Sequence, residues 1–248
     1  MGASTGIAWC DATWNCWQGC TKVSSGCSHC YMYREKKQYG QDPSVVVRSK
    51  PATFNAPLKW KPGKRVFVCS WSDFFHSAAD AWRAEAWAII QQRPDLTFLI
   101  LTKRIERVAM WPILWPSNNV TTWSNVWLGV SVEDQATADA RIPLLLQTPA
   151  AKRFVSYEPA IGPVNFECFP STGCPTGWLE DEAGIDWIIC GAESGPRARP
   201  MHPDWARSVR DQCQAAAVPF FFKQGPGDIG RFVKMPLLDG QEWREVPC

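Results

Sequence analysis

Three cysteines lie close together near the start of the chain: Cys20, Cys27 and Cys30. Six residues separate the first two and two residues separate the last two. The intervening serines and Gly26 favour a loop that can bring the sulfurs together. Tyr31 then opens a segment suited to a helix ending near Gly40, and a helix N-terminus favours thiolates. Three thiolates leave one metal position open, so the trio predicts a metal site with a free coordination position.

A closed metal site is the alternative interpretation of the same stretch. Cys16 lies only four residues before Cys20 and could compete with it as a ligand. Cys16, Cys20, Cys27 and Cys30 together would supply the four thiolates of a structural zinc site. Their gaps are not the paired two-residue knuckles common in zinc modules, which favours the open trio.

The composition indicates a cytosolic protein with reduced thiols. The 248 residues contain eleven cysteines, an odd number, and a formal net charge of only +2. No charged-then-apolar signal segment opens the chain, and its apolar runs are too short to cross a bilayer. In the cytosol, clustered cysteines bind metal more often than they form disulfides. We therefore expect a soluble protein that is not bound to a membrane.

Short apolar strands alternate with helices along the chain, which is typical of a parallel sheet buried on both faces. The expected strands are Thr5–Trp9, Arg65–Ser70, Thr97–Leu101, Asn125–Val130, Arg153–Ser156, Asp186–Cys190 and Pro219–Phe222, with helices at 78–92, 104–110, 135–146 and 204–217. This pattern predicts one α/β domain over 1–248, a partial (β/α)6 TIM-like barrel. An irregular connection at about 41–64 and a surface insertion at about 166–185 interrupt it.

Polar residues follow the expected strands at their C-terminal ends, where barrel folds collect binding and catalytic groups. They are Asp73, Lys103, Glu133, Glu158, Glu193 and Lys223. A single polar residue at a strand end is as often an ordinary surface residue. Six in register favour a shared site.

Several motifs together resemble the phage and prophage three-Cys-motif proteins, which are relatives of the radical S-adenosylmethionine (SAM) enzymes. They include Gly19-Cys20-Thr-Lys-Val-Ser, Cys27-Ser-His-Cys30-Tyr31, Leu101-Thr-Lys-Arg104, Leu128-Gly-Val-Ser-Val-Glu-Asp-Gln135, Gly191-Ala-Glu-Ser-Gly-Pro196 and Pro219-Phe-Phe-Phe-Lys-Gln224. The resemblance runs from about Thr5 to Gln224. The gap of six residues after Cys20 departs from the superfamily spacing of three, whereas the second gap and Tyr31 fit it.

The resemblance implies a radical-SAM barrel with a [4Fe–4S] cluster on Cys20, Cys27 and Cys30. SAM would bind the open iron, and its reductive cleavage would yield a 5′-deoxyadenosyl radical. Tyr31, Ser70, Ser72 and Asp73 would lie at the cofactor, the last three near the methionine amino group. Lys103 or Arg104 would hold the SAM carboxylate, and Ser131 and Glu133 the ribose. Glu158 and Glu193 would serve the substrate, as acceptors or as an acid/base pair.

The substrate implied by the phage resemblance is DNA. The sharpest hypothesis is an isomerase that rearranges an amino acid appended to thymidine in the cytoplasm of an infected bacterial host, with an electron donor such as a flavodoxin. Basic residues are concentrated in the first quarter of the chain, with Trp60 and Trp71 among them: Lys22, Lys36, Lys37, Arg48, Lys50, Lys59, Lys61, Lys64 and Arg65. Without the resemblance, a solvated basic face is the slightly better explanation of these residues. The rival functions are radical-SAM nucleic-acid repair or tRNA modification, and a non-enzymatic zinc-binding nucleic-acid module.

Overall fold

The computed structural model describes residues 5–110, 123–167, 177–179, 184–226 and 232–247. Its described part divides into two compact units. The first unit comprises residues up to Val23, Cys30–Gly129 and Gln147–Ala151. The second comprises Ser24–His29, Val130–Leu146 and Lys152 onward. The segment that carries Cys27 therefore belongs to the second unit, although Cys20 and Cys30 belong to the first.

The first unit contains strands in the order β1 (Ala12–Trp14), β4 (Arg65–Val68), β5 (Thr97–Thr102) and β6 (Val126–Val132), the last of which is divided between the units. The β1–β4 and β4–β5 pairs are parallel. Register pairs Trp14 with Val68 and Val68 with Ile100. Helices α3 (Asp80–Gln92) and α4 (Ile105–Met110) follow β4 and β5, and η3 (Ser77–Ala79) precedes α3. The β6 residues are all buried, as expected for a strand covered on both faces.

The first strand lies later in the chain than the sequence predicts. Thr5–Trp9 is not a strand: its end forms a turn in which Cys10 N donates to Ile7 O, and Trp9 packs on Phe67 with ring centroids 4.6 Å apart. Pairing with β4 selects Ala12–Trp14 instead. Apolar character alone could not distinguish a strand from a packed turn, so this prediction was wrong.

The connection at 41–64 is more ordered than predicted. It contains β3 (Val47–Arg48), which pairs antiparallel with β2 (Trp17–Gln18), then α2 (Pro51–Phe54) and η2 (Ala56–Lys59). Phe54 is buried, and its carbonyl accepts a hydrogen bond from Trp14 Nε1 at 2.9 Å. The Arg48 guanidinium lies over the Phe54 ring at 3.9 Å. The burial of Phe54 and the hydrogen bond that its carbonyl accepts therefore order a segment that lacks sequence periodicity.

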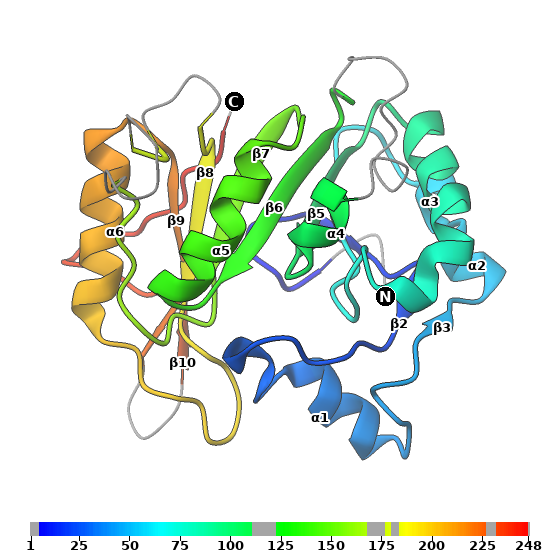
Figure 1. The fold of residues 1–248 in the computed structure, drawn as a ribbon, viewed down its shortest axis with the longest axis horizontal. Helices are drawn as coiled ribbons and strands as arrows, with labels where there is room; N and C mark the ends of the chain where they lie inside the picture. Colours follow the sequence, from blue (N-terminus) through cyan, green and yellow to red (C-terminus); the bar gives the residue numbers. More distant parts are fainter. Residues whose placement is uncertain (1–4, 111–122, 168–176, 180–183, 227–231, 248) are drawn as a thin grey trace. The chain divides into compact units, whose positions relative to one another are not determined.

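The second unit continues with β7 (Lys152–Tyr157), β8 (Trp187–Gly191), β9 (Phe220–Pro226) and β10 (Phe232–Lys234). The β7–β8 and β8–β9 pairs are parallel, and the β9–β10 pair is antiparallel. Helix α5 (Gln135–Leu146) has the predicted bounds, and α6 (Pro203–Ala215) packs on β8 and β9 (Figure 1). Pairing with β10 extends β9 to Pro226, so Lys223 lies inside a strand and not after one.

The large apolar residues in the described part of the predicted surface insertion are buried. Phe166, Trp178, Leu179 and Ile185 are each less than a tenth exposed. Trp178 N donates to Phe166 O and Ile185 N donates to Trp178 O. These flanking residues therefore belong to the core of the second unit; residues 168–176 and 180–183 lie outside the described residues.

The structure confirms a mixed α/β fold with a mostly parallel sheet. Among the described helices, none combines the length and apolar character needed to cross a membrane.

Candidate functional site

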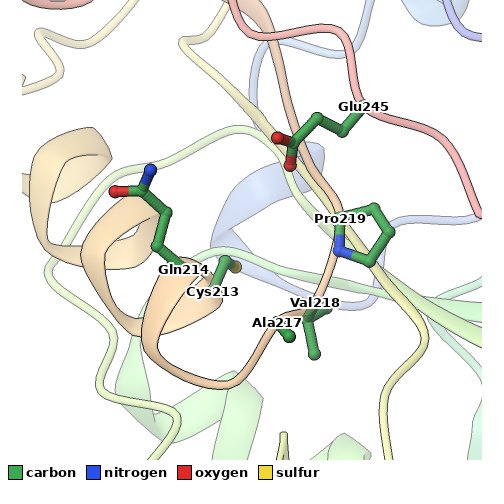
Figure 2. A pocket seen from close by; sticks show the side chains of 6 residues that line it. All are labelled: Cys213, Gln214, Ala217, Val218, Pro219 and Glu245. Carbon is green, nitrogen blue, oxygen red and sulfur yellow. The ribbon is translucent and has the colours of Figure 1, made fainter.

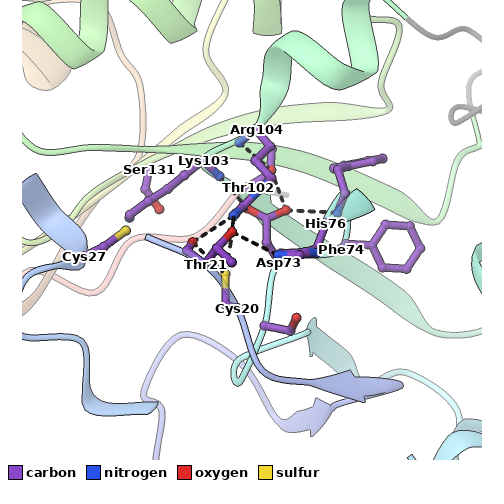
Figure 3. Close-up of polar contacts among 12 residues, drawn as sticks. Cys20, Thr21, Cys27, Asp73, Phe74, His76, Thr102, Lys103, Arg104 and Ser131 are labelled. Carbon is purple, nitrogen blue, oxygen red and sulfur yellow. Dashed lines mark hydrogen bonds and ion pairs between the residues drawn. The ribbon is translucent and has the colours of Figure 1, made fainter. Parts of the chain in front are cut away.

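In the first unit, the Asp73 carboxylate is the centre of a buried network just after β4 (Figure 3). Its Oδ1 accepts hydrogen bonds from Thr102 Oγ1 at 2.8 Å and from Phe75 N at 2.9 Å. Its Oδ2 accepts from Lys103 N at 2.9 Å and Arg104 Nη1 at 3.3 Å. Because the donors on both oxygens come from the protein, Asp73 joins the ends of β4 and β5 within this structure.

Arg104 connects that network to Cys20 (Figure 3). Its Nη1 donates toward Cys20 Sγ at 3.5 Å, and its Nη2 donates to Thr21 O and Thr21 Oγ1, both at 2.8 Å. Arg104 is only 6% exposed, so the Asp73 charge compensates for its burial. A guanidinium held in this way supplies both positive charge and an N–H donor at the sulfur of Cys20.

His76, which directly precedes η3, also supports the chain at Thr21. Its Nδ1 accepts from Ala78 N at 3.2 Å, so the ring proton lies on Nε2, which donates to Thr21 Oγ1 at 3.1 Å. Burial and the positive charge of Arg104 lower the pKa of His76. A neutral His76 therefore orients the Thr21 hydroxyl next to Cys20.

The main chain around Cys20 is fixed by further contacts in the first unit. Gly19 N donates to Trp71 O at 3.0 Å, Ser72 Oγ donates to Gly19 O at 2.5 Å, and Cys20 N donates to Pro43 O at 2.9 Å. The Gly19 φ is +97°, and a Cβ there would lie 2.1 Å from Val45 O. Glycine is therefore required immediately before Cys20.

Ser70 and Tyr31 connect the end of β4 to the start of α1 (Tyr31–Gln38). Tyr31 Oη donates to Ser70 O, while Asn15 Nδ2 donates to Ser70 Oγ at 3.0 Å. Asn15 Oδ1 also accepts from Trp71 N at 2.8 Å. Cys30 is the N-cap residue of α1, so its thiol stands at the positive end of that helix.

The cysteines differ in accessibility. Cys20, Cys27 and Cys30 are partly exposed, whereas Cys10, Cys16, Cys69, Cys190 and Cys213 are buried. Cys16 Sγ lies 3.4 Å from Cys69 Sγ, and burial raises the pKa of Cys69 well above its usual value. A fourth ligand from Cys16 would require its release from this buried pair.

In the second unit, Ser131 and Glu133 are buried near the end of β6. Arg141 of α5 donates to Ser131 O at 2.6 Å and to Glu133 Oε2 at 3.0 Å. Glu133 is 0% exposed, and its other oxygen accepts from Ser24 Oγ at 3.0 Å. The carboxylate predicted to bind ribose is thus occupied by two protein groups.

The two carboxylates predicted to serve the substrate also have protein partners in the second unit. Glu158 pairs with Lys223, with Oε1 and Nζ 2.6 Å apart. Glu193 accepts from Arg199 N at 2.8 Å, from the Arg199 guanidinium, and from His29 Nδ1 at 2.8 Å. Burial alone would raise the pKa of Glu193, but the hydrogen bonds from Arg199 and His29 outweigh it and lower the pKa to about 2. Glu193 is therefore ionised at neutral pH, which favours an acceptor over an acid.

A separate hollow in the second unit lies beside the C-terminal end of α6 (Figure 2). It is lined by Cys213, Gln214, Ala217, Val218, Pro219 and Glu245. Burial raises the pKa of Cys213, and Glu245 Oε2 accepts from Phe220 N at 2.9 Å. The Cys213 thiol is buried in the core, and the Glu245 carboxylate is hydrogen-bonded to the main chain. This hollow is therefore a weaker candidate than the strand ends.

Sequence reasoning missed the residues that support the predicted ones: Asn15, Thr21, Ser24, Arg141 and Arg199. Thr21 directly follows Cys20, and Arg199 lies six residues after Glu193, so proximity to a predicted residue was their only sequence signal. The sequence signal for Arg141 was weaker still, because it is only an arginine in the helix that follows Glu133.

The chemistry of the cysteine trio fits an iron–sulfur cluster in ligand type, ligand number and accessibility. Arg104 donates to the Cys20 sulfur, and Cys30 stands at the N-terminus of α1. Across the ranges that the structure describes, no three His, Cys, Asp or Glu side chains are already grouped to hold a metal ion.

The fold and these strand-end residues define a mixed α/β protein with a cysteine-bearing candidate site. Residues 4–247 match the model of the family described as "Protein of unknown function (DUF5131)", and the chain belongs to this family. The comparison with curated proteins found no match, and neither did the comparison with solved structures.

Proposed function

We propose that this chain is a radical SAM enzyme in which Cys20, Cys27 and Cys30 hold a [4Fe–4S] cluster within a partial (β/α)6 barrel. The observation that supports this most is the contrast among the thiols. These three are partly exposed, while the neighbouring Cys16 is buried against Cys69. Three accessible thiolates leave one iron for SAM. When bound, the cluster supplies the electron that cleaves SAM to a 5′-deoxyadenosyl radical.

The chain's own residues orient these ligands. Arg104 holds the turn at Cys20 through Thr21 and directs an N–H group at the Cys20 sulfur. Hydrogen bonds to cluster sulfurs are one of the means by which a protein adjusts cluster potential. Asp73 neutralises Arg104 and fixes it on the ends of β4 and β5. We assign Asp73 and Arg104 to this supporting role.

Other residues remain as cofactor contacts in the proposal. Lys103 is half-buried at the end of β5 and suits the SAM carboxylate. Tyr31 and Ser70 hold the start of α1 beside the end of β4, and Ser131 remains a candidate for the ribose. In barrel folds, binding groups collect at the C-terminal ends of the strands, which supports these assignments.

For the substrate we propose modified thymidine in DNA, with the amino acid appended to the base being rearranged. Lys37, Lys50, Lys59 and Lys61 are exposed in the first unit and suit phosphate contacts. The basic face is smaller than the sequence suggests. Lys36 is buried, and Arg48 and Arg65 face Glu85 and Asp11 at 2.6 Å and 3.6 Å.

The test is an anaerobic assay with reductant, SAM and phage DNA that carries aminoacylated thymidine. We expect 5′-deoxyadenosine to form and mass spectrometry of the digested DNA to show a nucleoside of unchanged mass but altered retention, as an isomerisation requires. A flavodoxin system and a chemical reductant serve as alternative electron donors. SAM cleavage that responds to tRNA or a small molecule, and not to this DNA, would contradict the substrate assignment.

A further inference from the structure

The short segment that carries Cys27 is held at both of its ends in the second unit. At its start, Ser24 Oγ donates to Glu133 Oε1 at 3.0 Å. At its end, His29 Nδ1 lies 2.8 Å from Glu193 Oε2. Both acceptors are carboxylates just after a strand, Glu133 after β6 and Glu193 after β8, and both are almost fully buried.

Each carboxylate is neutralised by its own arginine. Arg141 Nη1 lies 3.0 Å from Glu133 Oε2 and also donates to Ser131 O at 2.6 Å. Arg199 donates to Glu193 through its guanidinium and through its main-chain N–H. A buried carboxylate is costly unless it is paired and hydrogen-bonded, and each arginine supplies such a partner inside the unit.

The turn between the two ends fits directly against Glu133. A Cβ on Gly26 would lie 2.4 Å from Glu133 Cγ and 2.5 Å from Oε1. Gly26 is buried at the centre of η1 (Ser25–Cys27), where Cys27 N donates to Ser24 O at 3.0 Å. Only glycine allows this contact, so the position of the Cys27 main chain depends on the position of the carboxylate.

We infer that Glu133 and Glu193 are positioning residues that fix the Cys27 turn from its two ends, each backed by an arginine. This assigns both carboxylates to the assembly of the metal-binding segment, in place of ribose and substrate contacts. The relevance of Cys27 to iron rests on the proposed function, whereas the fixing of the turn does not. Removing either contact should loosen the turn before it affects the rest of the fold.

The experiment uses hydrogen exchange of the metal-free full-length protein, read by mass spectrometry of the peptide that contains Cys27. Ser24→Ala removes the contact to Glu133 but leaves the Glu133–Arg141 pair intact, so the fold is kept. We expect the Cys27 and Ser28 amides to exchange about fivefold faster, which is the effect of losing one hydrogen bond. His29→Ala should give a similar increase from the other end of the segment.

Two matched variants separate positioning from general loosening. Ser24→Thr retains the hydroxyl and should exchange like the wild type, and Ser25→Ala changes an exposed neighbour and should do the same. Iron uptake during anaerobic reconstitution should fall about twofold or more in Ser24→Ala and recover in Ser24→Thr.

Unchanged exchange in both Ser24→Ala and His29→Ala would overturn the inference, whatever the iron content. An equal increase in Ser25→Ala would also overturn it, because the effect would not depend on the carboxylates. A wild-type protein that takes up no iron, with the fivefold change still present, would refute the iron–sulfur proposal and support the positioning of the turn.

Discussion

Replacing Cys27 by alanine is expected to reduce the iron bound after anaerobic reconstitution from about four atoms per chain to less than about a tenth of that. The reason is that the cluster has three protein ligands in this account, and two cannot hold it. The same loss is expected for Cys20→Ala and Cys30→Ala. Elemental analysis and the thiolate-to-iron absorption near ~400 nm measure the outcome.

Cys16→Ala is the control for these variants, because Cys16 lies in the same part of the sequence but is buried beside Cys69. It should retain iron at the wild-type level. Iron that disappears with Cys16→Ala and persists with Cys20→Ala would show that the ligand set is wrong. Bound zinc in a colourless wild-type protein would favour the closed four-thiolate site.

The second large effect is expected on stability. Arg141→Met should lower the free energy of unfolding by about 3 kcal/mol, because it leaves the Glu133 carboxylate buried without a counter-charge. Methionine keeps much of the apolar length of the arginine, so lost packing contributes little. Urea denaturation of the reduced, metal-free protein, followed by tryptophan fluorescence, measures the change.

Arg207→Met provides the comparison in the second unit. Arg207 on α6 pairs with Asp204 at 2.6 Å and with Asp239 at 2.8 Å, but it is 41% exposed. Exposed pairs contribute little, so we expect a loss of less than about 1 kcal/mol. Equal losses for the two variants would mean that the buried Glu133–Arg141 pair has no special role in the second unit.

Much of the fold could be predicted because its signals are local. The apolar strands alternate with helices, and α5 has the predicted bounds, with Asp134 Oδ1 accepting from Thr137 N at its first turn. The first strand was misplaced because strand choice there depends on pairing with β4, which is not a local property. The same reason explains the unpredicted extension of β9 by β10.

The candidate site could be predicted only in part. Cysteine spacing is visible in the sequence, so the trio could be named. The groups that hold it cannot be found by spacing, since Arg104 and Thr21 are 83 residues apart, Ser24 and Glu133 are 109 apart, and His29 and Glu193 are 164 apart. Folding alone brings these pairs together. It also gives Asp73, Glu133 and Glu193 protein partners that a strand-end pattern does not indicate.

The central claim is that three sulfurs hold an iron–sulfur cluster with one iron left for SAM. The most direct measurement is the electron paramagnetic resonance spectrum of the reduced, reconstituted protein, recorded without and with SAM. Our account predicts the signal of a reduced [4Fe–4S] cluster whose g-values change when SAM is added, because SAM binds the free iron. A protein that has no such signal, or a signal unaltered by saturating SAM, would contradict it.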